Sequence, residues 1–85
     1  MPLTDENIKE RVNKILEVEF EIEPEDIKDE ANLFDDLELD SLDGIDLVLA
    51  LEKEFGYKLE EDVARQIRTV EDIYKEIIKV KDKIQ

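Results

Sequence analysis

Apolar residues recur at helical spacing near the start of the chain. Ile8, Val12, Ile15 and Leu16 stand at i, i+4, i+7 and i+8, a spacing that places side chains on one face of an α-helix. Thr4 precedes two acidic residues, as a helix-capping residue commonly does. The pattern predicts an amphipathic helix of about four turns that begins after Thr4.

The following segment lacks this period. Residues 18–23 alternate between apolar and acidic side chains as a strand would, but no second strand is visible to pair with them. We expect an extended loop with Phe20 and Ile22 turned inward, followed by a single helical turn at residues 24–27. Residues 28–40 are expected to form another loop, held by four apolar anchors: Leu33, Phe34, Leu37 and Leu39.

Three further helical elements are predicted. The first is capped by Asp40 or Ser41 and ends at Phe55, where a glycine follows. A short acidic turn covers residues 60–66, and Thr69 caps a last helix. The apolar residues of that last helix are Val70, Ile73, Tyr74, Ile77, Ile78 and Ile84. The expected fold class is therefore an all-α four-helix bundle with three longer helices and one short helix.

The helix that ends at Phe55 has two apolar faces. At about 100° per residue, one face collects Leu47, Val48, Leu51 and Phe55. The nearly opposite face collects Leu42, Ile45 and Leu49. Either both faces are core, or the second is exposed beside four acids: Asp40, Asp43, Asp46 and Glu52. The second alternative is a docking surface for a partner that carries basic residues.

Composition narrows the classes of function. The chain has 85 residues and a net charge of −14, which fits one domain over residues 1–85 and disfavours nucleic acid or anionic membranes as partners. It contains no Cys and no His, which removes disulfides, imidazole bases and ordinary zinc sites. No signal-like N-terminus and no membrane-length apolar run is visible. We expect a cytoplasmic monomer.

Ser41 allows two interpretations. It is either the N-cap of its helix or a point of attachment, because a helix N-terminus tolerates an anion next to a hydroxyl group. Without a histidine, Ser41 has only Asp40 as an adjacent titratable group. It is therefore not an activated nucleophile by itself, and any chemistry on it must be performed by another enzyme.

The run from Leu33 to Phe55 resembles the core of an acyl carrier protein. It contains Asp40-Ser41-Leu42, with Asp36-Leu37 upstream and Asp46-Leu47-Val48 downstream at the family's spacing. The resemblance implies a four-helix carrier domain that is not an enzyme and has neither catalytic residues nor a metal. It implies that a phosphopantetheinyl transferase attaches 4′-phosphopantetheine from coenzyme A to Ser41.

The resemblance further implies a role in fatty-acid biosynthesis or in a related specialised lipid or polyketide pathway. Acyl intermediates would travel as thioesters between synthases, transferases and reductases that have basic docking patches. The residues that would meet these partners are Asp40, Leu42, Asp43, Ile45, Asp46, Leu49 and Glu52. They coincide with the second apolar face and its acids.

Three positions depart from the family. Glu38 and Glu21 stand where glycine is common, and Gly44 stands inside a helix where a side chain is usual. Because a Cβ atom restricts the backbone, we expect the loop before Ser41 to differ. Gly44 either allows close backbone packing or opens a path into the core, or it is a helix-weakening residue that the fold tolerates. Likewise, the aliphatic residues beneath it either part to hold an acyl chain or form a plain core: Phe34, Leu47, Val48, Leu51, Ile67 and Ile73.

An acidic helical interaction module or a calcium-binding module is the alternative. The calcium-loop pattern fails, however, because alignment on Gly44 places Leu39 and Ala50 at the first and last ligand positions. A purely structural acidic module accounts for the charge but not for the motif around Ser41.

Overall fold

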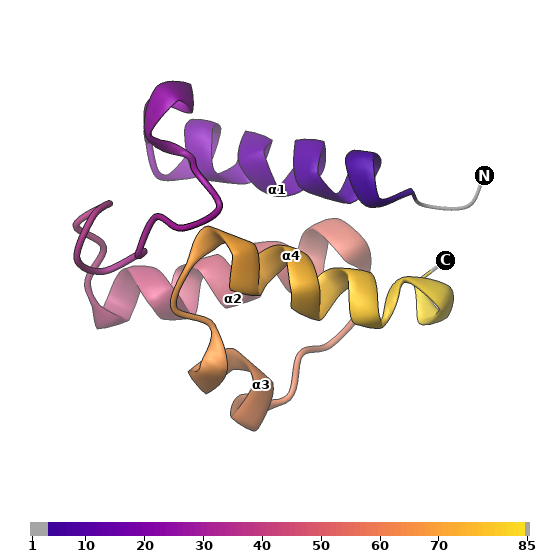
Figure 1. The fold of residues 1–85 in the computed structure, drawn as a ribbon. Helices are drawn as coiled ribbons and strands as arrows, with labels where there is room; N and C mark the ends of the chain where they lie inside the picture. The colour runs from indigo at the N-terminus through magenta and orange to yellow at the C-terminus, as the bar shows by residue number, and fades with distance from the viewer. Residues whose placement is uncertain (1–3, 85) are drawn as a thin grey trace.

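The computed structural model describes residues 4–84, and within them the regular structure is helical apart from one isolated bridge between Asn32 and Thr69. Residues 4–84 form four α-helices, which Figure 1 labels: α1 (Asp5–Glu19), α2 (Ser41–Phe55), α3 (Glu61–Gln66) and α4 (Val70–Lys79). Two 3₁₀ turns cover Pro24–Asp26 and Lys81–Lys83. The predicted all-α fold with three longer helices and one short helix is confirmed.

Residues 1–3 and 85 lie outside the described residues. The expectation that the N-terminus is not a signal sequence therefore stays a prediction. Across residues 4–84, each helix is too short or too polar to cross a membrane.

The helix boundaries follow from their caps. Thr4 Oγ1 accepts a hydrogen bond from the backbone N–H of Asn7 at 3.1 Å and so begins α1. Gly56 ends α2 with a φ of 62°, a left-handed conformation that glycine adopts without a Cβ clash. α4 ends at Lys79, so Ile84 lies beyond the helix to which its spacing assigned it. The predicted starts at Thr4 and Thr69 are confirmed.

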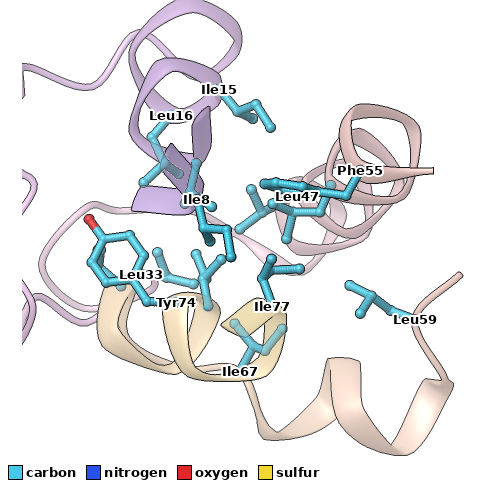
Figure 2. Packing of buried hydrophobic residues seen from close by; sticks show 14 of the residues in the cluster. Ile8, Ile15, Leu16, Leu33, Leu47, Phe55, Leu59, Ile67, Tyr74 and Ile77 are labelled. Carbon is cyan, nitrogen blue, oxygen red and sulfur yellow. The ribbon is translucent and has the colours of Figure 1, made fainter. Parts of the chain in front are cut away.

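The core lies where α1 packs against α2 and α4. Figure 2 shows side chains from these three helices converging on one another. The buried helical residues are Ile8, Val12, Ile15 and Leu16 of α1, Leu47, Leu51 and Phe55 of α2, and Val70, Ile73, Tyr74 and Ile77 of α4. Burying one such side chain stabilises the folded state by about 1.5–3 kcal/mol. The three buried side chains of α2 therefore hold this helix against α1 and α4.

The short helix α3 has no buried residue of its own. It is held by its flanks, where Leu59 and Ile67 are buried. A carboxylate oxygen of Glu52 in α2 accepts a hydrogen bond from the backbone N–H of Leu59 at 2.7 Å. α3 therefore lies beside the core that α1, α2 and α4 form and adds no buried side chain to it (Figure 1).

The loop that leads to α2 is fixed by backbone hydrogen bonds. Leu33 N donates to the carbonyl oxygen of Arg68 at 2.8 Å, and Leu39 N donates to Leu33 at 3.0 Å. Leu33 and Leu39 are buried and Leu37 is half-buried, as expected of anchors. Phe34 is not a buried anchor.

The Phe34 side chain is 39% exposed. Its ring lies over Gly44, where a Cβ would sit 3.5 Å from the ring edge. The ring therefore lies on the surface of α2 at Gly44 and not in the core.

Two glutamates have left-handed backbone conformations. Glu21 has a φ of 54° and Glu38 has a φ of 58°. Both occupy positions where glycine would be favoured, and a side chain in this conformation costs about 1–2 kcal/mol. We expected the Cβ of Glu38 to change the backbone of the loop before Ser41. The backbone at Glu38 nevertheless keeps the left-handed conformation that glycine favours. Phe20 and Ile22, beside Glu21, are half-buried against the core as expected.

Candidate functional site

Asp40, not Ser41, caps α2. Asp40 Oδ1 accepts a hydrogen bond from the backbone N–H of Asp43 at 2.9 Å, and Asp43 Oδ2 accepts one from the N–H of Asp40 at 3.2 Å. Ser41 is the first residue of the helix and is exposed. The capping interpretation of Ser41 is therefore wrong, and its hydroxyl group is not committed to the helix start.

The second apolar face of α2 is exposed. Leu42, Ile45 and Leu49 are 71%, 58% and 56% exposed, respectively. The opposite residues Leu47 and Leu51 are 2% and 1% exposed. The alternative in which both faces are core is wrong, and we call Leu42, Ile45 and Leu49 the exposed stripe.

The acids beside the exposed stripe differ in whether their side chains already hydrogen-bond to other parts of the chain. Asp40 and Asp43 form the reciprocal cap, and Glu52 is half-buried against the Leu59 amide. The Asp46 side chain is exposed and has no hydrogen bond or ion pair within residues 4–84. The structural task of Glu52 was missed at the level of sequence, because it depends on where the chain returns after Gly56.

A groove lies between α2 and α3 and has a volume of about 770 Å³. Ser41 is one of its lining residues, and its apolar lining includes Leu33, Phe34, Leu47, Val48, Leu51, Leu59 and Ile67. Five of the six aliphatic-lining candidates from the sequence line it, whereas Ile73 is fully buried in the core. An open apolar space therefore adjoins Ser41, while Leu47, Leu51 and Ile67 on its wall also belong to the buried core.

Basic residues also line this groove, and sequence reasoning missed them. They are Lys58, Arg65 and Arg68. Arg65 pairs with Glu61 one turn earlier on α3. Lys58 and Arg68 have no ion pair within the described part of the chain.

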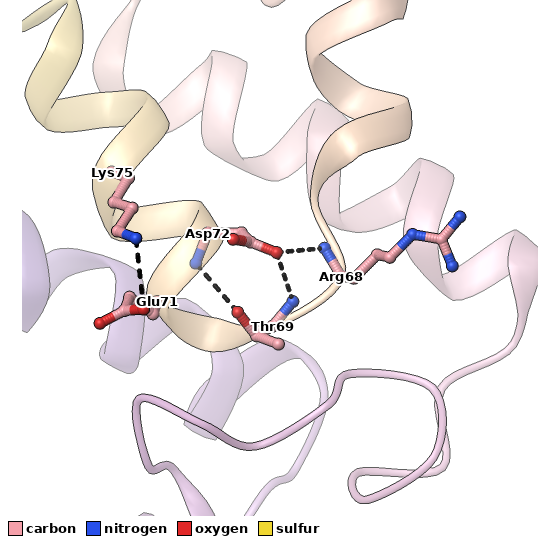
Figure 3. A network of polar contacts seen from close by, with 5 residues as sticks. All are labelled: Arg68, Thr69, Glu71, Asp72 and Lys75. Atoms are coloured by element: carbon pink, nitrogen blue, oxygen red, sulfur yellow. Dashed lines mark hydrogen bonds and ion pairs between the residues drawn. The ribbon is translucent and has the colours of Figure 1, made fainter.

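The segment between α3 and α4 is held by the Asp72 carboxylate, as Figure 3 shows. Asp72 Oδ2 accepts hydrogen bonds from the backbone N–H groups of Arg68 at 3.0 Å and Thr69 at 3.1 Å. Desolvation alone would raise the pKa of Asp72, but these bonds, the Thr69 side chain and the charge of Lys75 together hold that pKa below its usual value. The Arg68 guanidinium extends away from this network.

The start of α2 suits a flexible group that begins with an anion. The cap uses the N–H groups of Asp40 and Asp43, so those of Ser41 and Leu42 have no acceptor within residues 4–84. Free N–H groups and the helix dipole favour a phosphate at this end. An exposed hydroxyl group, two free N–H groups and an adjoining apolar groove fit a phosphate-linked arm with an apolar cargo.

Among residues 4–84, no three acidic side chains converge on a point that could hold a metal ion.

Known proteins with similar sequences agree with this site. The family model "Phosphopantetheine attachment site" matches residues 8–77. Acyl carrier proteins of Bradyrhizobium sp. (strain ORS 278), Rhodopseudomonas palustris (strain TIE-1) and Nitrobacter hamburgensis are each 47% identical to this chain over 68 residues, which is 80% of this chain and 86% of theirs. This chain therefore belongs to the acyl carrier protein family, whose members are carriers rather than enzymes and whose prosthetic group is 4′-phosphopantetheine.

Proposed function

We propose that Ser41 is the attachment residue for 4′-phosphopantetheine in this chain, and that residues 1–85 act as one carrier domain for acyl groups. The observation that carries the proposal is the exposed Ser41 hydroxyl, which Asp40 relieves of the capping task. When bound, the group supplies a terminal thiol that holds acyl groups as thioesters. The apolar groove that Ser41 helps to line supports an aliphatic cargo.

The chain's own part in attachment is to present a nucleophile. The Ser41 oxygen forms a bond to the phosphorus that bears pantetheine in coenzyme A, and the bond from that phosphorus to adenosine 3′,5′-bisphosphate breaks. The hydroxyl proton passes to a base of the transferase, because this chain has no histidine and Asp40 is engaged in the helix cap.

The exposed stripe is the proposed docking surface for the transferase and for acyl-processing enzymes. Its three apolar side chains would be covered by the partner, and the neighbouring Asp40, Asp43 and Asp46 would face basic residues. From Asp35 to Asp46 there are six acids and no base. This charge raises the rate at which a basic partner encounters the Ser41 end of α2.

The pathway we propose is fatty-acid biosynthesis or a related specialised lipid or polyketide pathway, in the cytoplasm and with the chain as a monomer. The apolar lining of the groove favours aliphatic cargo over strongly polar cargo.

The direct test is incubation with coenzyme A, Mg²⁺ and a broad-specificity phosphopantetheinyl transferase. We expect one added group, located by fragmentation within the tryptic peptide of residues 29–53. Ser41 is the only hydroxyl-bearing residue of that peptide. Addition to a peptide that contains Thr4, Thr69 or a tyrosine would contradict the assignment.

A further inference from the structure

The groove between α2 and α3 combines an apolar lining with unpaired positive charge. Basic side chains are scarce in this chain, at 12 against 26 acids. Three of them, Lys58, Arg65 and Arg68, nevertheless line this groove. Of the three, only Arg65 has an ion-pair partner within residues 4–84, which is Glu61. An apolar cavity with uncompensated cations complements an amphipathic anion better than a neutral aliphatic chain.

The two unpaired bases lie toward opposite ends of the groove. Arg68 is beside Leu33 through their backbone hydrogen bond of 2.8 Å, and the next residue, Phe34, covers Gly44 near Ser41. Lys58 precedes Leu59, whose N–H is bound by Glu52 near the other end of α2. The part of α2 that lines the groove, Ser41 to Leu51, spans about 15 Å given the helical rise. Lys58 is therefore the cation remote from the attachment point.

We propose that this groove selects acyl cargo with a carboxylate at the end remote from the thioester, and that Lys58 is the residue that binds this carboxylate. The inference rests on the proposed attachment at Ser41. A cargo that enters from Ser41 places its aliphatic part against Leu47, Leu51 and Ile67 and its far end near Lys58. The phosphodiester of the arm, the other available anion, is fixed at the Ser41 end and would meet Arg68 instead.

The test compares two cargoes of equal chain length, an unsubstituted acyl group and an ω-carboxyacyl group. Both are loaded with a phosphopantetheinyl transferase from the corresponding coenzyme A thioesters, and loading is checked by intact mass. The readout is the rate of thioester cleavage by hydroxylamine, which falls when the cargo lies in the groove. Wild type is compared with Lys58→Gln and with Lys53→Gln, a matched loss of one charge at an exposed position of α2 that does not line the groove.

We expect Lys58→Gln to speed cleavage of the ω-carboxyacyl thioester roughly two- to fivefold, as loss of one exposed ion pair would. The unsubstituted thioester should be unaffected, and added salt should shrink the difference. Lys53→Gln should change neither rate.

Equal effects of Lys58→Gln on the two cargoes would overturn the proposal, as would an equal effect of Lys53→Gln. Arg68→Gln could instead remove the difference in cleavage rate between the ω-carboxyacyl and the unsubstituted thioester. The anion would then be bound at the Ser41 end, and Lys58 would not be its ligand. Failure of loading itself would refute the attachment at Ser41, whereas loading without discrimination would refute only this inference.

Discussion

The Asp40 carboxylate accepts a hydrogen bond from the backbone N–H of Asp43 at 2.9 Å, directly across Ser41. This contact assigns the two tasks at the start of α2 to different residues. Asp40 stabilises the helix, and the Ser41 hydroxyl stays available for modification. A single serine that performed both tasks would lose its cap whenever its oxygen was esterified.

The strained backbone at Glu38 predicts a stabilising substitution. Its φ of 58° is one that glycine adopts freely. Glu38→Gly removes a Cβ clash of about 1–2 kcal/mol and adds roughly 0.5–1 kcal/mol of unfolded-state entropy. We expect a net gain of up to about 1.5 kcal/mol in the free energy of unfolding, measured by urea denaturation. Glu21→Gly should behave alike, and Glu30→Gly, at an exposed loop residue not among those with positive φ, should not.

The two glycines predict opposite responses to alanine. A Cβ at Gly44 would meet the Phe34 ring at an ordinary contact distance of 3.5 Å, so Gly44→Ala should raise stability by about 0.5–1 kcal/mol through helix propensity. Gly56 has a φ of 62°, so Gly56→Ala should lower stability by about 1–2 kcal/mol. Thermal unfolding followed by circular dichroism measures both. A loss of stability in Gly44→Ala would mean that the Phe34 ring cannot accommodate a methyl group.

The exposed stripe predicts a separation of docking from folding. Ile45 is 58% exposed, so Ile45→Arg should leave the free energy of unfolding within about 0.5 kcal/mol of wild type. It should nevertheless slow modification by the transferase, because it places a positive charge against a basic partner. Leu47→Ala, on the buried face, should instead cost about 2–5 kcal/mol. A large fall in the melting temperature of Ile45→Arg would contradict the assignment of this face.

Asp72 predicts a pH-dependent contribution to stability. Its folded pKa lies below the usual 3.8, since the hydrogen bonds and Lys75 outweigh the desolvation that would raise it. A depressed carboxyl pKa stabilises the fold above the unfolded value and loses that effect as the pH falls through the folded value. Asp72→Asn should therefore be less stable than wild type at pH 7, and the difference should shrink toward pH 3. Asp82→Asn, at an exposed residue, is the control.

Local patterns in the sequence were sufficient for the helices and the two faces of α2. Thr4 and Thr69 cap their helices through neighbours three residues away, and the period of 3.6 residues separates Leu47 from Ile45. These signals are short-range and hence visible in one dimension. The choice between Asp40 and Ser41 as the cap could not be predicted from the sequence. Both residue types are good caps, and only the backbone geometry distinguishes them.

What the sequence did not reveal depends on contacts between distant segments. The burial of Glu52 against Leu59 requires the return of the chain after α2, and the contact of the Phe34 ring with Gly44 joins the loop to a helix ten residues later. The convergence of Lys58 and Arg68 on one groove depends on how α3 lies against α2. No periodicity marks such residues, since their roles arise only when separate elements meet.

The most direct test of the central claim is intact-mass analysis of wild type and Ser41→Ala after incubation with coenzyme A, Mg²⁺ and the transferase, with melting curves of both. Wild type should gain one 4′-phosphopantetheinyl group. Ser41→Ala should gain none and should melt within a few degrees of wild type, because Asp40 supplies the cap. An unmodified wild type, or a modified Ser41→Ala, would contradict the account.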